Sequence, residues 1–100
     1  MSFKSGPAAN TLAVLGDQLY VKASATLAAL KHNEYFIGLN VASLVSVDEA
    51  GIKLEVVMRD AQGRQLVHVA GYDEPQLMRD FQKACMDYND LKLKAAQQHG

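Results

Sequence analysis

Apolar residues recur every three or four positions over residues 10–31, a spacing that places their side chains on one face of an α-helix. Alanines between these positions add helix propensity. The pair Gly16-Asp17 lies between runs with β-forming residues, so a hairpin at this pair is the alternative interpretation. We favour the helix. The apolar positions are Leu12, Leu15, Leu19, Ala23, Thr26, Leu27 and Leu30.

The pattern changes after Asn33 to three runs rich in β-forming residues, at 35–47, 52–59 and 64–72. Two four-residue segments, 48–51 and 60–63, separate the runs, and both have Asp first and Gly fourth. This order is typical of a type I turn that ends with a glycine at positive φ. The three runs therefore predict an antiparallel meander with two tight turns.

The chain ends in a second predicted helix, which begins at Asp73 as the capping residue, with Pro75 in its first turn. Its apolar stripe continues to Leu91, and lysines follow near its end, as the helix dipole prefers. The fold class is thus α+β: an N-terminal helix, a three-stranded antiparallel meander and a C-terminal helix. Both helices must bury a stripe, so we expect them on one face of the sheet. Residues 1–9, with Gly6 and Pro7, predict a flexible lead-in to a single domain at 10–98.

The register of the two hairpins decides which side chains share a face of the sheet, because a shift of one residue inverts the faces. Pairing Val47 with Ile52 gives a coherent apolar core face. This face holds Ile37, Leu39, Val41, Val45, Ile52, Leu54, Val56 and Met58.

The second hairpin has two possible registers. Pairing Arg59 with Arg64 adds Val67 and Val69 to the core face. The opposite face then holds two rows, Ala42, Val57 and Leu66, and Leu44, Glu55 and His68. A three-residue loop with a glycine bulge would pair Asp60 with Arg64 and turn Leu66 and His68 into the core. We favour the first register, because a buried histidine must find a polar partner.

The charges are balanced, with 10 Lys and Arg against 11 Asp and Glu. We therefore expect no nucleic-acid partner, since such binding requires several clustered phosphate contacts. A local cluster of Lys53, Arg59 and Arg64 at the second hairpin is a weaker alternative. Cys85 is the single cysteine, so an internal disulfide is impossible and a cytoplasmic location is expected. No run approaches the ~20 apolar residues that span a membrane, so we expect no membrane partner.

Few residues of the chain suggest catalytic or cofactor chemistry. His32, His68 and His99 are far apart in the sequence, and no pair has metal-ligand spacing. Cys85 lies on the apolar stripe of the last helix, where a cysteine acts as a small hydrophobe. Glycines do not form a phosphate-binding motif. We therefore predict no catalytic residue, no metal and no cofactor.

The expected function is a small protein-binding or adaptor module that works as a homodimer or with another protein. Its contact surface would be the uncovered sheet face, with Val57, Leu66, Ala42, Leu44, Glu55 and His68 as partner-binding residues. An apolar cluster ringed by charge is typical of protein contacts. The alternative is a small-molecule-binding domain or a minor enzyme with a pocket between the sheet and the helices.

Overall fold

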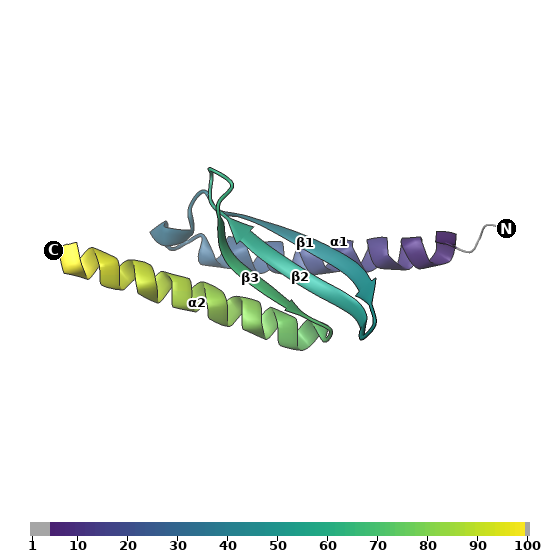
Figure 1. Cartoon of the computed structure of the whole chain (residues 1–100). Coiled ribbons are helices and arrows are strands. Elements are labelled where there is room, and N and C mark those ends of the chain that lie inside the picture. The colour runs from purple at the N-terminus through teal and green to yellow at the C-terminus, as the bar shows by residue number, and fades with distance from the viewer. Residues whose placement is uncertain (1–4, 100) are drawn as a thin grey trace.

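The structure is a computed structural model that describes residues 5–99. Its elements, in chain order, are α1 (Ser5–Leu30), the 3-10 helix η1 (Glu34–Phe36), β1 (Asn40–Asp48), β2 (Gly51–Arg59), β3 (Gln65–Gly71) and α2 (Glu74–His99). The predicted order of helix, meander and helix is confirmed (Figure 1). The hairpin alternative is wrong, because α1 continues through Gly16 and Asp17 without a break.

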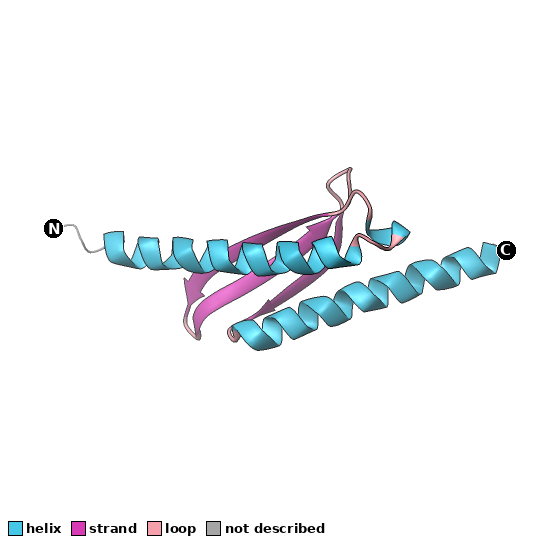
Figure 2. Cartoon of the chain, turned by 180° about the vertical axis from the view of Figure 1, so that it is seen from behind, coloured by secondary structure: helices cyan, strands magenta, loops and turns pink. Residues whose placement is uncertain are grey.

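Both helices lie on the same face of the sheet. The strands are antiparallel in the order β1-β2-β3, and in Figure 1 they lie in front of the helices. Figure 2 shows the molecule from behind, with the two helices in front. α1 packs mainly on β1 and α2 mainly on β3. Within residues 5–99 no helix lies on the opposite face of the sheet, and the sequence predicted this arrangement of both helices on one face.

The helices are longer than the sheet and overhang it at opposite ends (Figures 1 and 2). The radius of gyration is 16.0 Å, whereas a compact chain of this length has about 13 Å. The extra length comes from the first half of α1 and the second half of α2. These overhanging segments expose apolar side chains, among them Val14 on α1 and Leu91 on α2.

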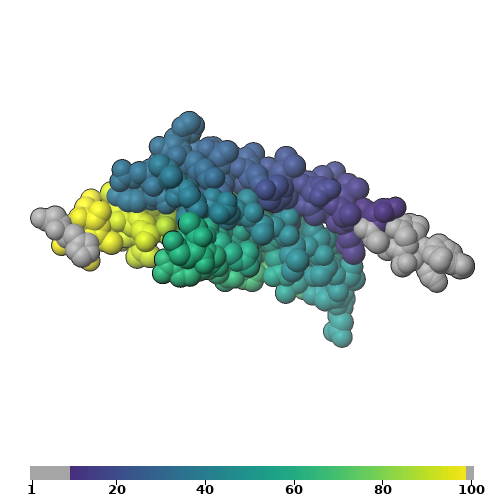
Figure 3. Space-filling model, turned by 90° about the horizontal axis from the view of Figure 1, so that it is seen from above, coloured from purple at the N-terminus to yellow at the C-terminus, as the bar shows by residue number. Residues whose placement is uncertain are grey.

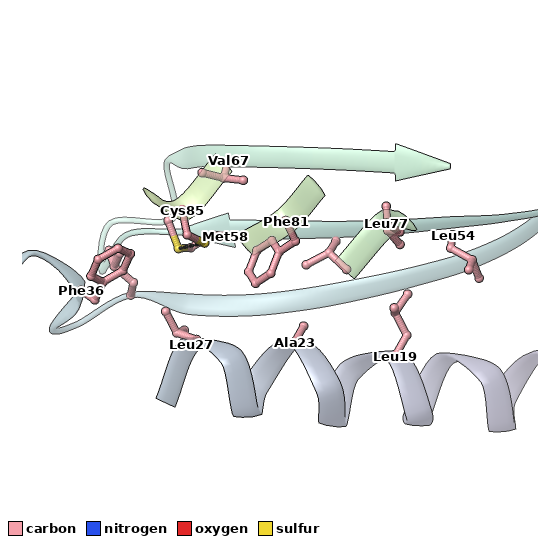
Figure 4. Close-up of a cluster of buried hydrophobic side chains, with 12 residues drawn as sticks. Leu19, Ala23, Leu27, Phe36, Leu54, Met58, Val67, Leu77, Phe81 and Cys85 are labelled. Carbon is pink, nitrogen blue, oxygen red and sulfur yellow. Dashed lines mark hydrogen bonds between the residues drawn. The ribbon is translucent and has the colours of Figure 1, made fainter. Parts of the chain in front are cut away.

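The core fills the space between the sheet and the two helices (Figure 4). Val56 and Met58 on the central strand β2 are fully buried, and so are Ala23 of α1 and Phe81 of α2. Ala23 is small where Phe81 is large, so the two helices can both approach β2 closely. The remaining core residues are Leu19, Leu27, Phe36, Leu39, Leu54, Val67, Leu77 and Cys85.

The first helix starts earlier than the sequence indicated. α1 begins at Ser5, so it includes residues 5–9 of the expected flexible lead-in, while residues 1–4 lie outside the described residues. The second helix ends at His99, a few residues beyond the end in the mid-nineties that the apolar stripe and the late lysines predict.

The first β-rich run does not begin as a strand. The Asn33 side chain accepts a hydrogen bond from the Tyr35 N–H, which starts η1, and Phe36 is buried in the core. Gly38 follows at φ +84°, and β1 starts only at Asn40. Ile37, predicted to lie on the core face, is therefore 70% exposed. The prediction failed because a capped turn competes with an extended run of the same composition.

The first hairpin has the predicted register, with Val47 opposite Ile52. Gly51 and Gly63, the last residues of the two turns, both have positive φ, as the Asp-first, Gly-fourth order predicted. The core-face residues of β1 and β2 accordingly share the helix side. Val47 and Ile52 are exposed all the same, because they lie at the hairpin end of the sheet.

The second hairpin has neither of the two registers considered. It opens as in the bulged alternative, since the Asp60 N–H donates to the Arg64 carbonyl oxygen and Arg59 pairs with Gln65. The register then shifts by one residue, so that Met58 pairs with Val67. Leu66 is the extra residue of this β-bulge.

The bulge restores the faces of the preferred register, although the pairing differs. Val67 is buried and Val69 packs against the core, as predicted, and His68 is exposed on the opposite face. However, Val57 pairs with His68 rather than with Leu66. The sequence pattern does not reveal the bulge. Pairing Asp60 with Arg64 would turn His68 into the core, but the extra residue Leu66 shifts the register by one and returns His68 to the open side.

Asp60 stabilises the turn that produces this register. Its Oδ1 accepts hydrogen bonds of 2.9 Å from the backbone N–H groups of Gln62 and Arg64, and its Oδ2 accepts one of 2.7 Å from Arg64 Nε. The bond from the Arg64 backbone N–H contributes most to lowering the pKa of the Asp60 carboxyl. The ionised carboxylate therefore favours the folded chain.

We expect Asp60→Ala to lower the thermal unfolding midpoint at neutral pH. A lowered folded-state pKa contributes stability above the ordinary value of 3.8, and this stability is lost as the pH falls through the folded value. The difference in midpoint between wild type and variant should thus shrink below about pH 4. Asp60→Asn is the matched control, because it can still accept the backbone bonds but carries no charge. Thermal melts with an unchanged difference at acidic pH would contradict this role.

Candidate functional site: the open face of the sheet

The uncovered side of the sheet, here called the open face, is formed by alternate residues of the three strands. These are the even-numbered residues of β1, the odd-numbered residues of β2, and His68 and Ala70 of β3. Its apolar members are Ala42, Leu44, Val57 and Ala70. Leu44 is 59% exposed, Ala42 and Ala70 are also exposed, and Val57 is half-buried among them. An apolar side chain as exposed as Leu44 leaves burial free energy unused in the single chain.

His68 and Glu55 form a hydrogen-bonded pair near the centre of the open face. His68 Nε2 lies 2.9 Å from Glu55 Oε1, as the sequence predicted for a solvent-facing His68. The pair is diagonal across the strands, because Val57 is directly opposite His68 and Glu55 is opposite Ala70. Both side chains therefore have a partner within the open face and do not need one from the core.

Leu66, predicted to bind a partner on the open face, does not lie on that face in the structure. The bulge turns its side chain away from the row of Ala42 and Val57, and it packs partly buried against the core. There it lines a shallow hollow together with Tyr88 and Leu91 of α2. The open face is thus built from five of the six predicted residues: Ala42, Leu44, Glu55, Val57 and His68.

The basic residues Lys53, Arg59 and Arg64 do not form a cluster. Lys53 and Arg59 lie near opposite ends of β2, six residues and thus about 20 Å apart. Arg64 is in the turn and forms an ion pair with Asp60 at 2.7 Å. An arrangement this dispersed does not favour a nucleic-acid contact, which depends on neighbouring cations.

Sequence reasoning did not identify Tyr72, which lies at one end of the open face. Its hydroxyl donates a hydrogen bond of 2.6 Å to Asp48 Oδ2 at the end of β1. This bond raises the pKa of Tyr72 and lowers that of Asp48. Residues two apart in a strand share a face, so the placement of His68 and Ala70 on the open face also predicts that Tyr72 lies on it.

A second surface feature lies between α1 and the outer edge of β1, and we call it the edge groove. It consists of two hollows that share Tyr20 and Val41. One hollow reaches Gly16 and Asp17 of α1, and the other reaches Lys31 just after the helix. The Ser43 hydroxyl donates a 3.1 Å hydrogen bond to the Gly16 carbonyl oxygen and fixes α1 beside the strand.

The described residues contain no group of three or more His, Cys, Asp or Glu side chains that could hold a metal ion. Cys85 is fully buried, with its thiol 4.0 Å from Met58 Sδ (Figure 4). Burial raises the pKa of the Cys85 thiol to about 11. The expectation that Cys85 is a core residue is therefore confirmed.

No protein-family model, curated protein or solved structure matches this chain. Among residues 5–99, neither helix is sufficiently long and apolar to cross a bilayer. The open face and the edge groove are therefore the surfaces whose geometry suggests a function.

We expect His68→Ala to change the free energy of unfolding by less than about 1 kcal/mol, because the His68 side chain is 40% exposed and water weakens its contact with Glu55. Urea denaturation of wild type and variant measures this change. Val67→Ala is the control, since it truncates the buried neighbour and should cost distinctly more. A larger loss for His68→Ala than for Val67→Ala would show that His68 has a structural role.

We expect the Cys85 thiol to resist aromatic disulfide reagents in the folded protein. With a pKa of about 11, only about one thiol in ten thousand is ionised near neutral pH. The labelling rate should therefore rise sharply with urea, in parallel with unfolding. Rapid labelling of the folded chain would contradict the buried position of Cys85.

Proposed function

We propose that this protein is a cytoplasmic, homodimeric protein-binding module whose two copies meet through the open face. The observation that carries the proposal is the exposure of Leu44, at 59%, in a face that neither helix covers. Ala42 and Val57 beside Leu44, and Ala70 on β3, are small or β-branched, which allows two sheets to approach closely. The free, buried Cys85 agrees with a reducing compartment.

The charges of the open face suit a contact between identical surfaces. Lys53 and Glu55 are two residues apart on β2, so their side chains point to the same side. In a two-fold contact, each surface is its own partner. Lys53 of one copy can then lie against Glu55 of the other, and the same pair forms a second time.

The size of the face predicts a weak dimer. Three strands about 4.8 Å apart and nine residues of about 3.4 Å define a surface of roughly 14 by 30 Å. This is about half of the ~800 Å² that each partner contributes to a typical stable interface. We therefore expect a dissociation constant in the micromolar range. At this affinity the effect of one substitution on dimerisation is easily measured.

The alternative of a ligand pocket between the sheet and the helices has less support. The twelve core side chains fill that space, and the largest of them, Phe36 and Phe81, are fully buried. The hollows of the edge groove lie outside the core, along β1. We therefore propose no second function for the interior.

We expect Leu44→Asp to convert the dimer into a folded monomer. Each copy would place a carboxylate in the apolar part of the contact, where desolvation and repulsion weaken association by at least about tenfold. The fold should lose little, because Leu44 is already exposed. Sedimentation equilibrium over a range of concentrations, combined with circular dichroism, measures both effects.

Two matched variants make this test specific. Leu91→Asp is the control, since Leu91 is 66% exposed on α2, which packs on the other face of the sheet, and this change should leave the dimer intact. Val21→Asp tests the outer side of α1, where Val21 is 63% exposed. A wild type that remains monomeric at high concentration would refute the proposal. So would a dimer that only Val21→Asp disrupts.

A further inference from the structure

β1 is an unprotected edge strand. It has nine residues, carries no charge between Asn40 and Asp48, contains no proline, and pairs with β2 without a bulge. The other edge strand, β3, has seven residues and is bulged at Leu66. Natural proteins usually protect an edge with charges, prolines or bulges, because its free N–H and C=O groups attract further strands. β1 lacks all of these features.

The edge groove lies directly beside this strand. Figure 3 views the molecule from the side on which α1 and β1 lie together. Ala13, Gly16 and Ser24 line the groove from α1 with small side chains, and Tyr20 lies where its two hollows meet. A strand edge flanked by a helix is the arrangement in which several domains bind an extended peptide as an added strand.

A second copy of the chain does not fit this edge. α1 packs mainly on β1 in each copy, so pairing β1 with β1 would bring two α1 helices to about one strand spacing, ~4.8 Å. Packed helices need at least about 8 Å between their axes. The occupant must therefore be an extended segment without a helix on that side.

The charges at the two ends of the groove indicate the direction of such a segment. Asp17 lies at the end near Ser43, and Lys31 lies at the end near Asn40. No ion pair joins either side chain to another described residue. Thirteen helical residues lie between them, so their backbones are about 21 Å apart along α1, which corresponds to about six residues of an extended chain. Antiparallel pairing is the more stable kind, and it places the N-terminal end of the segment near Asp17.

We propose that the edge of β1 binds an extended segment of a partner protein in antiparallel orientation. The segment has a basic residue at its N-terminal end, beside Asp17, and an acidic residue about six positions later, beside Lys31. Small and β-branched residues lie between them and fill the edge groove. Backbone hydrogen bonds to β1 provide affinity, and the two end charges select the orientation. The contact does not depend on the dimer, because it uses a strand edge and a helix flank.

The probe is a blocked, fluorescent peptide, Lys-Thr-Val-Ser-Val-Thr-Glu, and its matched control exchanges the terminal Lys and Glu. Fluorescence anisotropy at low salt should show that wild type prefers the first peptide by about fivefold, since two exposed ion pairs become two repulsions. The double variant Asp17→Lys, Lys31→Glu should reverse this preference. Hydrogen exchange should show that the bound peptide protects amides of β1 and not those of β3.

The same titration on Val57→Asp separates this proposal from the dimer, because this variant places a carboxylate on the open face of the central strand β2 and leaves β1 unchanged. Retained peptide preference in a monomeric variant supports the edge contact, whatever interface the dimer uses. Equal binding of both peptides, no binding of either, or an unchanged preference in the double variant would overturn it. Protection confined to β3 or to the helices would also overturn it.

Discussion

The packing of both helices on one face of a three-stranded sheet is the constraint on which the rest of the structure depends. Val56 and Met58 on β2 are completely buried only because α1 and α2 cover them from the same side. Two helices are needed for this single face, since α1 rests mainly on β1 and α2 mainly on β3. Residues 5–99 contain no further α-helix that could cover the opposite face, so that face of the sheet is open to water.

The one-sided core also shapes the edges of the sheet. α1 packs mainly on β1, whose outer edge has no neighbouring strand, and a second helix at that edge would come too close to α1. The open face has no such obstacle, so it can meet an identical surface. The packing of both helices on one face thus leaves two different surfaces. The open face has room for a second copy of the chain, whereas the edge of β1 has room only for an extended segment, so we propose different partners for them.

Several particular residues show which features can be predicted from the sequence. The pairing of Val47 with Ile52 follows from the Asp48-to-Gly51 turn and from the alternation of apolar residues on either side of it. The apolar stripes of both helices and the exposure of His68 opposite the core follow from periodicity in the same way. By contrast, the Asn33 cap that converts 34–36 into η1 is a local hydrogen bond, which composition does not distinguish from a strand. The bulge at Leu66 is likewise invisible to a pattern with a period of two.

The sequence by itself determined the elements, their order, the core face of β1 and β2, and five of the six open-face residues, because these depend on side-chain period and turn chemistry between near neighbours. Only the tertiary structure decided that Leu66 joins the core beside α2, that Tyr72 reaches Asp48 across the sheet, and that α1 lies along the edge of β1. These features join residues distant in sequence, and their positions depend on how two long helices share one small sheet. A linear pattern records which face a residue prefers, but it does not record which distant side chain will occupy the space beside it.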